Sequence, residues 1–242
     1  MPDRLFEEPR LAEVYDLFDS SERPDLDPYI AMSDAFGAQS VIDVGCGTGT
    51  LACRLAALGR EVIGVDPADA SLKVASLKAY AHRVRWIHGT TKMLAGLKVD
   101  LVTMTGNVAQ VFITDEEWMS TLRECRGVIR PDGRLVFEVR DPLKEAWKDW
   151  TREQSYQVIE APEIGRVETW VDLVDVQLPL VSFRHTFVFQ RDGTVLTSDS
   201  TLRFRSKTEI FNSLFAAGLA VVDVRDAPDR PGREFVFIAR PD

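Results

Sequence analysis

A mostly apolar run that ends in a glycine-rich turn constrains this chain more than any other feature. Residues 41–44 read as a buried strand, and glycines follow at alternate positions, at Gly45, Gly47 and Gly49. Because glycine lacks a Cβ and reaches positive φ without strain, such a turn lets backbone N–H groups approach a ligand. Apolar residues then recur at helical spacing over 51–58, and 61–66 reads as a strand that ends in an acid. The order strand, glycine turn, helix, strand predicts a nucleotide-type βαβ unit.

The glycine spacing separates two families with this outline. Dinucleotide-binding proteins use G-x-G-x-x-G, whereas this chain has G-x-G-x-G with Asp43 two residues before the first glycine. That pattern resembles motif I of the class I S-adenosyl-L-methionine-dependent methyltransferases, and Asp66 matches the family's acid at the tip of the second strand. The resemblance implies a turn that holds the amino acid part of the cofactor S-adenosyl-L-methionine and a carboxylate that binds its ribose hydroxyls.

The resemblance also implies the fold class: α/β, with a Rossmann-like seven-stranded, mostly parallel sheet flanked by helices. Helical spacing predicts helices over 70–81, 115–128 and 207–218. Strands are expected over 84–89, 100–107, 135–139, 219–224 and 234–239, the fifth preceded by a turn over 130–134. Between 143 and 206, alternating runs and the turn signal Asp192-Gly193 predict an antiparallel β insertion after the fifth strand.

These elements divide the chain into four predicted parts. Residues 1–40 form an N-terminal helical cap, 41–142 the cofactor-binding core, 143–206 the insertion, and 207–242 the C-terminal completion of the core. Such an insertion commonly covers the substrate or joins two copies in proteins that this one resembles. We therefore expect a substrate lid or a homodimer contact there.

Bulk properties narrow the class of protein. The 242 residues suffice for one sizeable α/β domain with an insertion. A net charge of −9 argues against general nucleic-acid binding, which depends on clustered Lys and Arg. The three cysteines have no zinc or disulfide spacing, and no targeting or membrane-spanning segment is recognisable. A cytoplasmic protein without a metal is expected.

Further cofactor contacts are implied outside the glycine turn. Tyr15, beside Asp16, matches a Tyr-Asp pair whose phenol reaches the cofactor carboxylate in many relatives, although a core ring fits its apolar stripe equally well. After the third strand the usual polar pair is replaced by Gly89-Thr90-Thr91, which leaves the adenine contact open. Asn107 and Gln110 should face the same crevice, or else cap a helix and lie in solvent. The full predicted cofactor-binding set is Tyr15, Asp43, Gly45, Cys46, Gly47, Gly49, Asp66, Pro67, Gly89, Thr90, Thr105, Gly106, Asn107 and Gln110.

The chemistry implied by such a cofactor needs few protein groups, because a methyl on a sulfonium is already activated. Proximity and orientation can contribute about 7–11 kcal/mol. No catalytic residue is defined by the sequence; His185, Glu138 and Asp141 are candidates. Alternation places His185 beside Phe183 and Phe187, which favours a half-buried structural histidine.

The sequence thus predicts a methyltransferase that acts on N or O of a small-molecule acceptor. The alternatives are a protein or tRNA methyltransferase, and a non-catalytic protein that binds S-adenosyl-L-methionine or oligomerises. The acceptor itself has no signature in the sequence. Aromatic residues of the insertion could line an acceptor pocket or fill a small core; they are Trp147, Trp150, Tyr156, Trp170 and Phe183.

Overall fold

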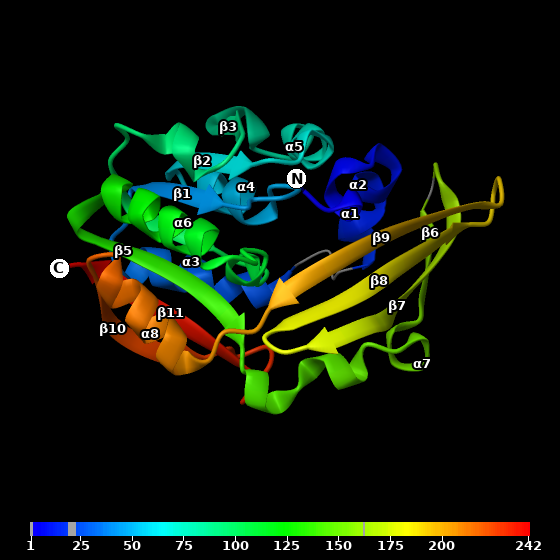
Figure 1. Ribbon diagram of the computed structural model, residues 1–242. Helices are drawn as coiled ribbons and strands as arrows, with labels where there is room; N and C mark the ends of the chain where they lie inside the picture. Colours follow the sequence, from blue (N-terminus) through cyan, green and yellow to red (C-terminus); the bar gives the residue numbers. More distant parts are fainter. Residues whose placement is uncertain (1, 19–22, 162) are drawn as a thin grey trace.

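A seven-stranded sheet forms the centre of the molecule in the computed structural model, which describes residues 2–18, 23–161 and 163–242 (Figure 1). The strand order is β10-β11-β5-β4-β1-β2-β3. Six of these strands run in the same direction, and β11 runs in the opposite direction between β10 and β5. The predicted fold class is confirmed. The strands are β1 (Ser40–Val44), β2 (Glu61–Asp66), β3 (Val84–His88), β4 (Val99–Met104), β5 (Ile129–Arg140), β10 (Leu219–Asp226) and β11 (Glu234–Pro241).

Helices cover both faces of this sheet because alternate strand residues point to opposite sides. On β1, Val41 packs with α3 (Asp27–Ala35) and α4 (Thr50–Ala57), whereas Ile42 packs with α6 (Asp115–Val128) and α8 (Lys207–Ala216). The α6 helix begins with a capping box between Thr114 and Glu117, which fixes its start beside the strand ends.

The N-terminal helices join the core to the second sheet. They are α1 (Arg4–Glu7) and α2 (Pro9–Tyr15), followed by the 3₁₀ turn η1 (Asp16–Phe18). Leu5, Leu11 and Val14 share one apolar cluster with residues of the insertion, and α2 also contacts α5 (Asp69–Ser76). Of the predicted cap, residues 1 and 19–22 lie outside the described residues.

The insertion forms a four-stranded antiparallel sheet that projects from the core (Figure 1). Its strands are β6 (Gln157–Ala161), β7 (Gly165–Gln177), β8 (Leu180–Phe189) and β9 (Thr194–Arg203), and the segment before them contains η6 (Pro142–Lys144), η7 (Ala146–Asp149) and α7 (Arg152–Ser155). Arg203 pairs with Asp115 at 2.9 Å, and Arg205 donates to the Phe112 carbonyl at 2.8 Å. These contacts tie the far end of β9 to the start of α6.

Two elements differ from their predicted lengths. The helix expected over 70–81 ends at Ser76, because Leu77 is 87% exposed with no core to cover and Tyr80 has φ 65°. The fifth strand begins at Ile129 and not after the turn at 130–134, since Ile129 already pairs with Val99 before a register shift. In the described ranges no helix is both long enough and apolar enough to cross a bilayer.

Candidate functional site

The glycine turn lies between β1 and α4, and its three glycines have positive φ of 67°, 52° and 78°. A Cβ on Gly45 would lie 2.6 Å from Val108, and one on Gly49 would lie 2.5 Å from the Trp86 ring. A Cβ on Gly47 would meet nothing within 4 Å. Packing therefore requires two of the glycines, whereas the third faces open space.

Asp66 at the end of β2 holds this turn in place. One carboxylate oxygen accepts from the Gly47 N–H at 2.8 Å, and the other accepts from the Ala68 N–H at 2.8 Å. Burial raises the pKa of Asp66, while these two hydrogen bonds act in the opposite direction. Because each carboxylate oxygen can accept more than one hydrogen bond, Asp66 keeps capacity for two further donors.

Asp43 supplies a second buried acid beneath the turn. Its carboxylate accepts from the Thr103 hydroxyl at 2.9 Å, and burial raises its pKa to about 7, with the nearby Asp66 charge adding to the increase. Burial and these two acids also raise the pKa of the Cys46 thiol. The turn therefore lies over two buried acids whose ionised forms are disfavoured by burial.

A cavity of about 450 Å³ opens beside the turn, between the ends of β1–β3 and the first half of α6. Four predicted cofactor contacts line it: Gly45, Pro67, Gly89 and Thr90. The opposite wall was not predicted, and it consists of α6 residues Glu116, Glu117, Ser120, Thr121 and Glu124. Their spacing of three and four residues places them on one polar side of the helix, and this spacing is the pattern in the sequence that could have predicted the wall. Thr91, next to Thr90, donates to Glu124 across the cavity wall.

The N-terminal segment is fastened to the glycine turn. Asp16 accepts from the Thr48 hydroxyl at 2.6 Å and pairs with Lys78 at 2.6 Å. Tyr15, one residue earlier, is half-buried with its ring edge-on to Phe6, 5.4 Å between centroids. The structure thus places Tyr15 near the turn, and its contact with a cofactor stays a prediction.

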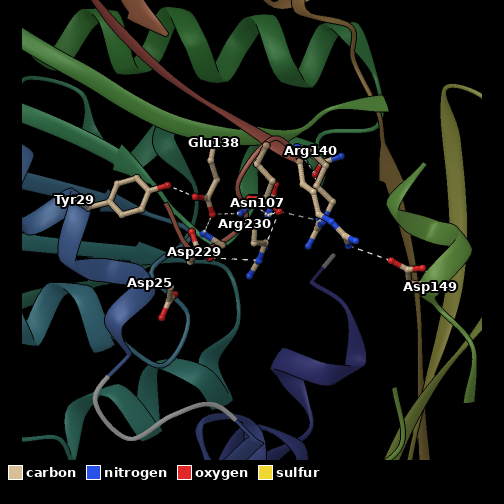
Figure 2. A network of polar contacts seen from close by, with 12 residues as sticks. Asp25, Tyr29, Asn107, Glu138, Arg140, Asp149, Asp229 and Arg230 are labelled. Carbon is tan, nitrogen blue, oxygen red and sulfur yellow. Dashed lines mark hydrogen bonds and ion pairs between the residues drawn. The ribbon is translucent and has the colours of Figure 1, made fainter. Parts of the chain in front are cut away.

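Asn107 and Gln110 are not among the residues that line the cavity; Gln110 contacts Arg140 of β5, and Asn107 contacts Glu234 of β11. Figure 2 shows Asn107 within this network. Asn107 and Gln110 lie on the 3₁₀ turn η5 (Val108–Gln110) and its preceding residue, and they are 2% and 1% exposed, so the alternative of a solvated Gln110 is wrong. Asn107 occupies the helix N-cap position with φ 61° but makes no side-chain cap bond. Thr105 is half-buried and Gly106 is exposed at the same strand end.

Four residues at this end of the sheet form a ring of polar contacts that is closed through the backbone. Asn107 Nδ2 lies 3.3 and 3.4 Å from the two Glu234 oxygens, and Glu234 Oε1 lies 3.6 Å from Arg140 Nε. Arg140 Nη1 donates to Gln110 Oε1 at 3.1 Å, and the Gln110 backbone N–H donates to the Asn107 carbonyl at 2.9 Å, which completes the ring. Arg230 also donates to Glu234, at 2.7 Å. We call Asn107, Gln110, Arg140 and Glu234 the polar ring.

Glu138 and Asp141, two of the candidate bases, have structural partners. Glu138 is buried and accepts from the Tyr29 hydroxyl and from the backbone N–H groups of Gly106, at 2.7 Å, and Asn107, at 3.1 Å. Burial raises its pKa. Asp141 accepts from the Leu143 N–H at 3.0 Å at the start of η6. These contacts give both acids a positioning role.

His185 lies on β8 between Phe183 and Phe187, with ring centroids 6.2 and 5.3 Å away. Burial lowers its pKa to about 4, so its ring is neutral at pH 7. Trp150 packs on Phe183 at 4.7 Å, and the Arg140 guanidinium lies 5.7 Å from the Trp150 ring. This side of the insertion therefore faces the polar ring.

Two of the other insertion aromatics lie apart from this group. Trp170 pairs in register with Thr186, so it lies on the opposite face of the sheet from His185, where it stacks on Tyr156. Trp147 is buried against Phe204 in a small core against which Trp150 also packs. The small-core alternative thus holds for Trp147 and Trp150, and an acceptor pocket stays a prediction.

The strand order, the glycine turn after β1 and the acid at the end of β2 are the features that this chain shares with the class I S-adenosylmethionine-dependent methyltransferases. Comparison with known proteins agrees, since residues 41–133 match the family model described as "Methyltransferase domain". That range contains the glycine turn, Asp66, β2–β4 and all of β1 except Ser40. The core of the chain is therefore similar to a methyltransferase domain, and its fold is that of a solved S-adenosylmethionine-dependent methyltransferase from Clostridium acetobutylicum, with a TM-score of 0.75 at 16% identity.

Individual relatives match over part of their length. A putative methyltransferase of Geobacillus sp. is 33% identical over 111 residues, 45% of each chain. The ubiquinone/menaquinone biosynthesis C-methyltransferase of Rubrivivax gelatinosus is 30% identical over 146 residues, 59% of this chain and 54% of that protein. This chain thus spans about half the length of these curated relatives. Among solved structures, the CcbJ methyltransferase from Streptomyces caelestis superposes with a TM-score of 0.76 at 21% identity, over 96% of both chains.

Proposed function

We propose that this chain binds S-adenosyl-L-methionine at the glycine turn and transfers its methyl group to N or O of a small-molecule acceptor. The observation that carries the proposal is the pairing of Gly47 with Asp66. The Gly47 backbone is held at positive φ with its α-carbon facing open space, while the carboxylate beside it retains acceptor capacity next to a 450 Å³ cavity. One matched relative is a C-methyltransferase of quinone biosynthesis, in line with a small-molecule acceptor.

The residues present fit this cofactor. Asp66 would accept from its ribose hydroxyls, and the cavity between Gly89, Thr90 and α6 would take its adenine. When bound, the cofactor supplies a methyl group already activated by a sulfonium. A cationic ligand above Asp43 and Asp66 would favour the ionised forms of these two acids, which burial alone disfavours.

Orientation carries the catalysis in this proposal. Glu138 and Asp141 are engaged in structural hydrogen bonds, and the His185 ring is buried and neutral. A neutral amine acceptor needs at most a weak base, so alignment of its lone pair with the methyl group supplies most of the rate, about 7–11 kcal/mol.

Calorimetric titration with S-adenosylmethionine and S-adenosylhomocysteine tests the cofactor assignment. We expect both to bind the wild type, and Asp66→Asn to weaken both by about tenfold or more, because a charged acceptor is lost. Asp132→Asn makes the same change at an exposed position near the start of β5 and should bind as the wild type does. A wild-type protein that binds neither compound would overturn the proposal.

We also propose a homodimer through the insertion and a cytoplasmic location. Exposed apolar side chains gather at the β7–β8 hairpin, where Val174 is 58%, Val176 40% and Leu178 61% exposed. Such a cluster favours self-association. The three cysteines are free thiols, which suits a reducing compartment.

A further inference from the structure

The 3₁₀ turn η5 presents two sides to two different spaces. Residues three apart nearly eclipse one another in a 3₁₀ helix, so Val108 and Val111 share one side and Asn107 and Gln110 share another. Val108 and Val111 line the 450 Å³ cavity together with Gly45. Asn107 and Gln110 instead face Arg140 and Glu234 of β5 and β11, which lie beyond β4 from the glycine turn.

The polar ring fixes which way each amide points. A guanidinium can only donate, so the atom of Gln110 that faces Arg140 is its oxygen. Glu234 accepts from Arg230 as a carboxylate, so the atom of Asn107 that faces it is its NH₂ group. Asn107 Oδ1 and Gln110 Nε2 are therefore the two ends turned out of the ring.

Both outward ends are buried and lack a hydrogen-bond partner within the described residues. A buried polar atom left without a partner is unfavourable, because it has lost its hydrogen bonds to water without gaining others. Two of them, one acceptor and one donor, on the same side of one helical turn indicate a ligand with complementary groups. Trp150 lies against the Arg140 guanidinium, the group that the Gln110 oxygen faces, and Phe183 packs on Trp150.

We propose that Asn107 Oδ1 and Gln110 Nε2 bind the methyl acceptor and not the cofactor; this inference rests on the methyltransferase function proposed above. The acceptor then carries an N–H or O–H group next to an oxygen that accepts a hydrogen bond, as in an amino alcohol. Its N–H or O–H donates to Asn107, and its neighbouring oxygen accepts from Gln110. The acceptor lone pair forms the new bond to the methyl carbon, the electrons of the carbon–sulfur bond go to sulfur, and the acceptor proton leaves to water.

The test compares two cofactor analogues by calorimetry. S-adenosylhomocysteine has no group beyond sulfur, whereas sinefungin carries an ammonium in the position of the transferred methyl. Gln110→Glu keeps an oxygen toward Arg140 and turns the outward donor into an anionic acceptor. We expect this variant to bind S-adenosylhomocysteine within about twofold of the wild type and to prefer sinefungin about tenfold more strongly, because a charge-assisted hydrogen bond is added.

Asn107→Gly provides a second variant that the backbone tolerates, since residue 107 has φ 61°. It removes the outward acceptor and should reduce the preference for sinefungin about fivefold, at unchanged affinity for S-adenosylhomocysteine. Gln154→Glu, at an exposed position of α7, adds the same charge remote from the ring and should leave both affinities unchanged.

The results separate the possibilities. If Gln110→Glu weakens both analogues equally, its amide faces the cofactor carboxylate and the inference is wrong. An unchanged ratio in both Gln110→Glu and Asn107→Gly also overturns it, because neither outward end then faces the acceptor side. If the wild type binds neither analogue, the proposed methyltransferase function fails and this inference fails with it.

Discussion

At the scale of single residues, the three glycines of the turn have different reasons to be glycine. Gly45 and Gly49 are in contact with Val108 and Trp86, so a side chain there would collide with the core. A Cβ on Gly47 would meet no other atom within 4 Å, so position 47 requires glycine only for its φ of 52° and for the close approach of the proposed ligand. The sequence spacing predicted the turn but did not distinguish these roles, because Val108 and Trp86 are distant in the chain.

Gly47→Ala should therefore separate folding from binding. We expect a loss of about 1 kcal/mol in the free energy of unfolding, because a left-handed conformation is strained for alanine. Binding of S-adenosylhomocysteine should fall by about tenfold or more, since the methyl group occupies the side of approach. Gly49→Ala should destabilise by about 1–3 kcal/mol through overpacking against Trp86. Urea unfolding and calorimetry measure the two effects; wild-type affinity in Gly47→Ala would contradict the proposed ligand position.

Asp43 makes the stability of the ligand-free protein depend on pH. Its pKa is raised from 3.8 to about 7 on folding, so the favourable protonated state is fully present below pH 3.8 and is lost as the pH rises through about 7. Asp43→Asn should retain the Thr103 contact without the buried charge. We expect its free energy of unfolding to exceed that of the wild type by about 4 kcal/mol at pH 8 and to match it at pH 4. Urea unfolding across this range gives the difference, and parallel curves for the two proteins would refute the raised pKa.

At the scale of elements, the sequence predicted those helices and strands that depend on the pattern of neighbouring residues. Apolar spacing gave α6 at 115–128, and strict alternation indicated the insertion strands. The polar ring could not be predicted from the sequence, because Asn107 and Glu234 are 127 positions apart and meet only where β11 lies beside β5. Likewise, alternation could not tell which face of the insertion would meet the core, so Trp150 and Trp170 could not be assigned to different sides.

The contacts of Asp16 with Thr48 and Lys78 are predicted to hold the N-terminal helices against the glycine turn. Asp16 pairs with Lys78 and Thr48 where its side chain is 26% exposed, so Asp16→Ala should cost about 1 kcal/mol. Hydrogen exchange of α2 amides should become about fivefold faster, since this segment opens locally. Lys73→Ala breaks the exposed pair with Asp69 and should change exchange less. Equal effects in both variants would contradict a specific fastening by Asp16.

At the scale of the whole molecule, two sheets are joined by three connections. These are the segment before β6, the contacts of Arg203 and Arg205 with the start of α6, and the helices α1 and α2. The core sheet is covered on both faces by helices, whereas the β7–β8 hairpin exposes apolar side chains at the end of the insertion sheet nearer the core, where Leu180 pairs with Arg203 (Figure 1). This distribution makes the hairpin the expected contact between copies.

Val174→Lys should therefore shift the protein toward a monomer. A lysine at the centre of a dimer contact would bury a charge without a partner, which costs several kcal/mol. Val195→Lys is the matched control, because Val195 is 57% exposed in the same small sheet but lies on β9. Sedimentation velocity measures the molar mass of each variant. A wild type that sediments as a monomer at all concentrations would rule out the dimer.

The Tyr29–Glu138 contact links the turn that carries Asn107 to a helix that packs on one face of the sheet. Glu138 accepts a hydrogen bond from the Tyr29 hydroxyl on α3, and it also accepts hydrogen bonds from the backbone N–H groups of Gly106 and Asn107. A change as small as Tyr29→Phe would remove one hydrogen bond to Glu138 without altering any proposed ligand contact. On the proposed role of Asn107 in acceptor binding, substitutions in α3 are expected to alter the acceptor preference indirectly, so a library directed at α3 becomes a route to new substrates.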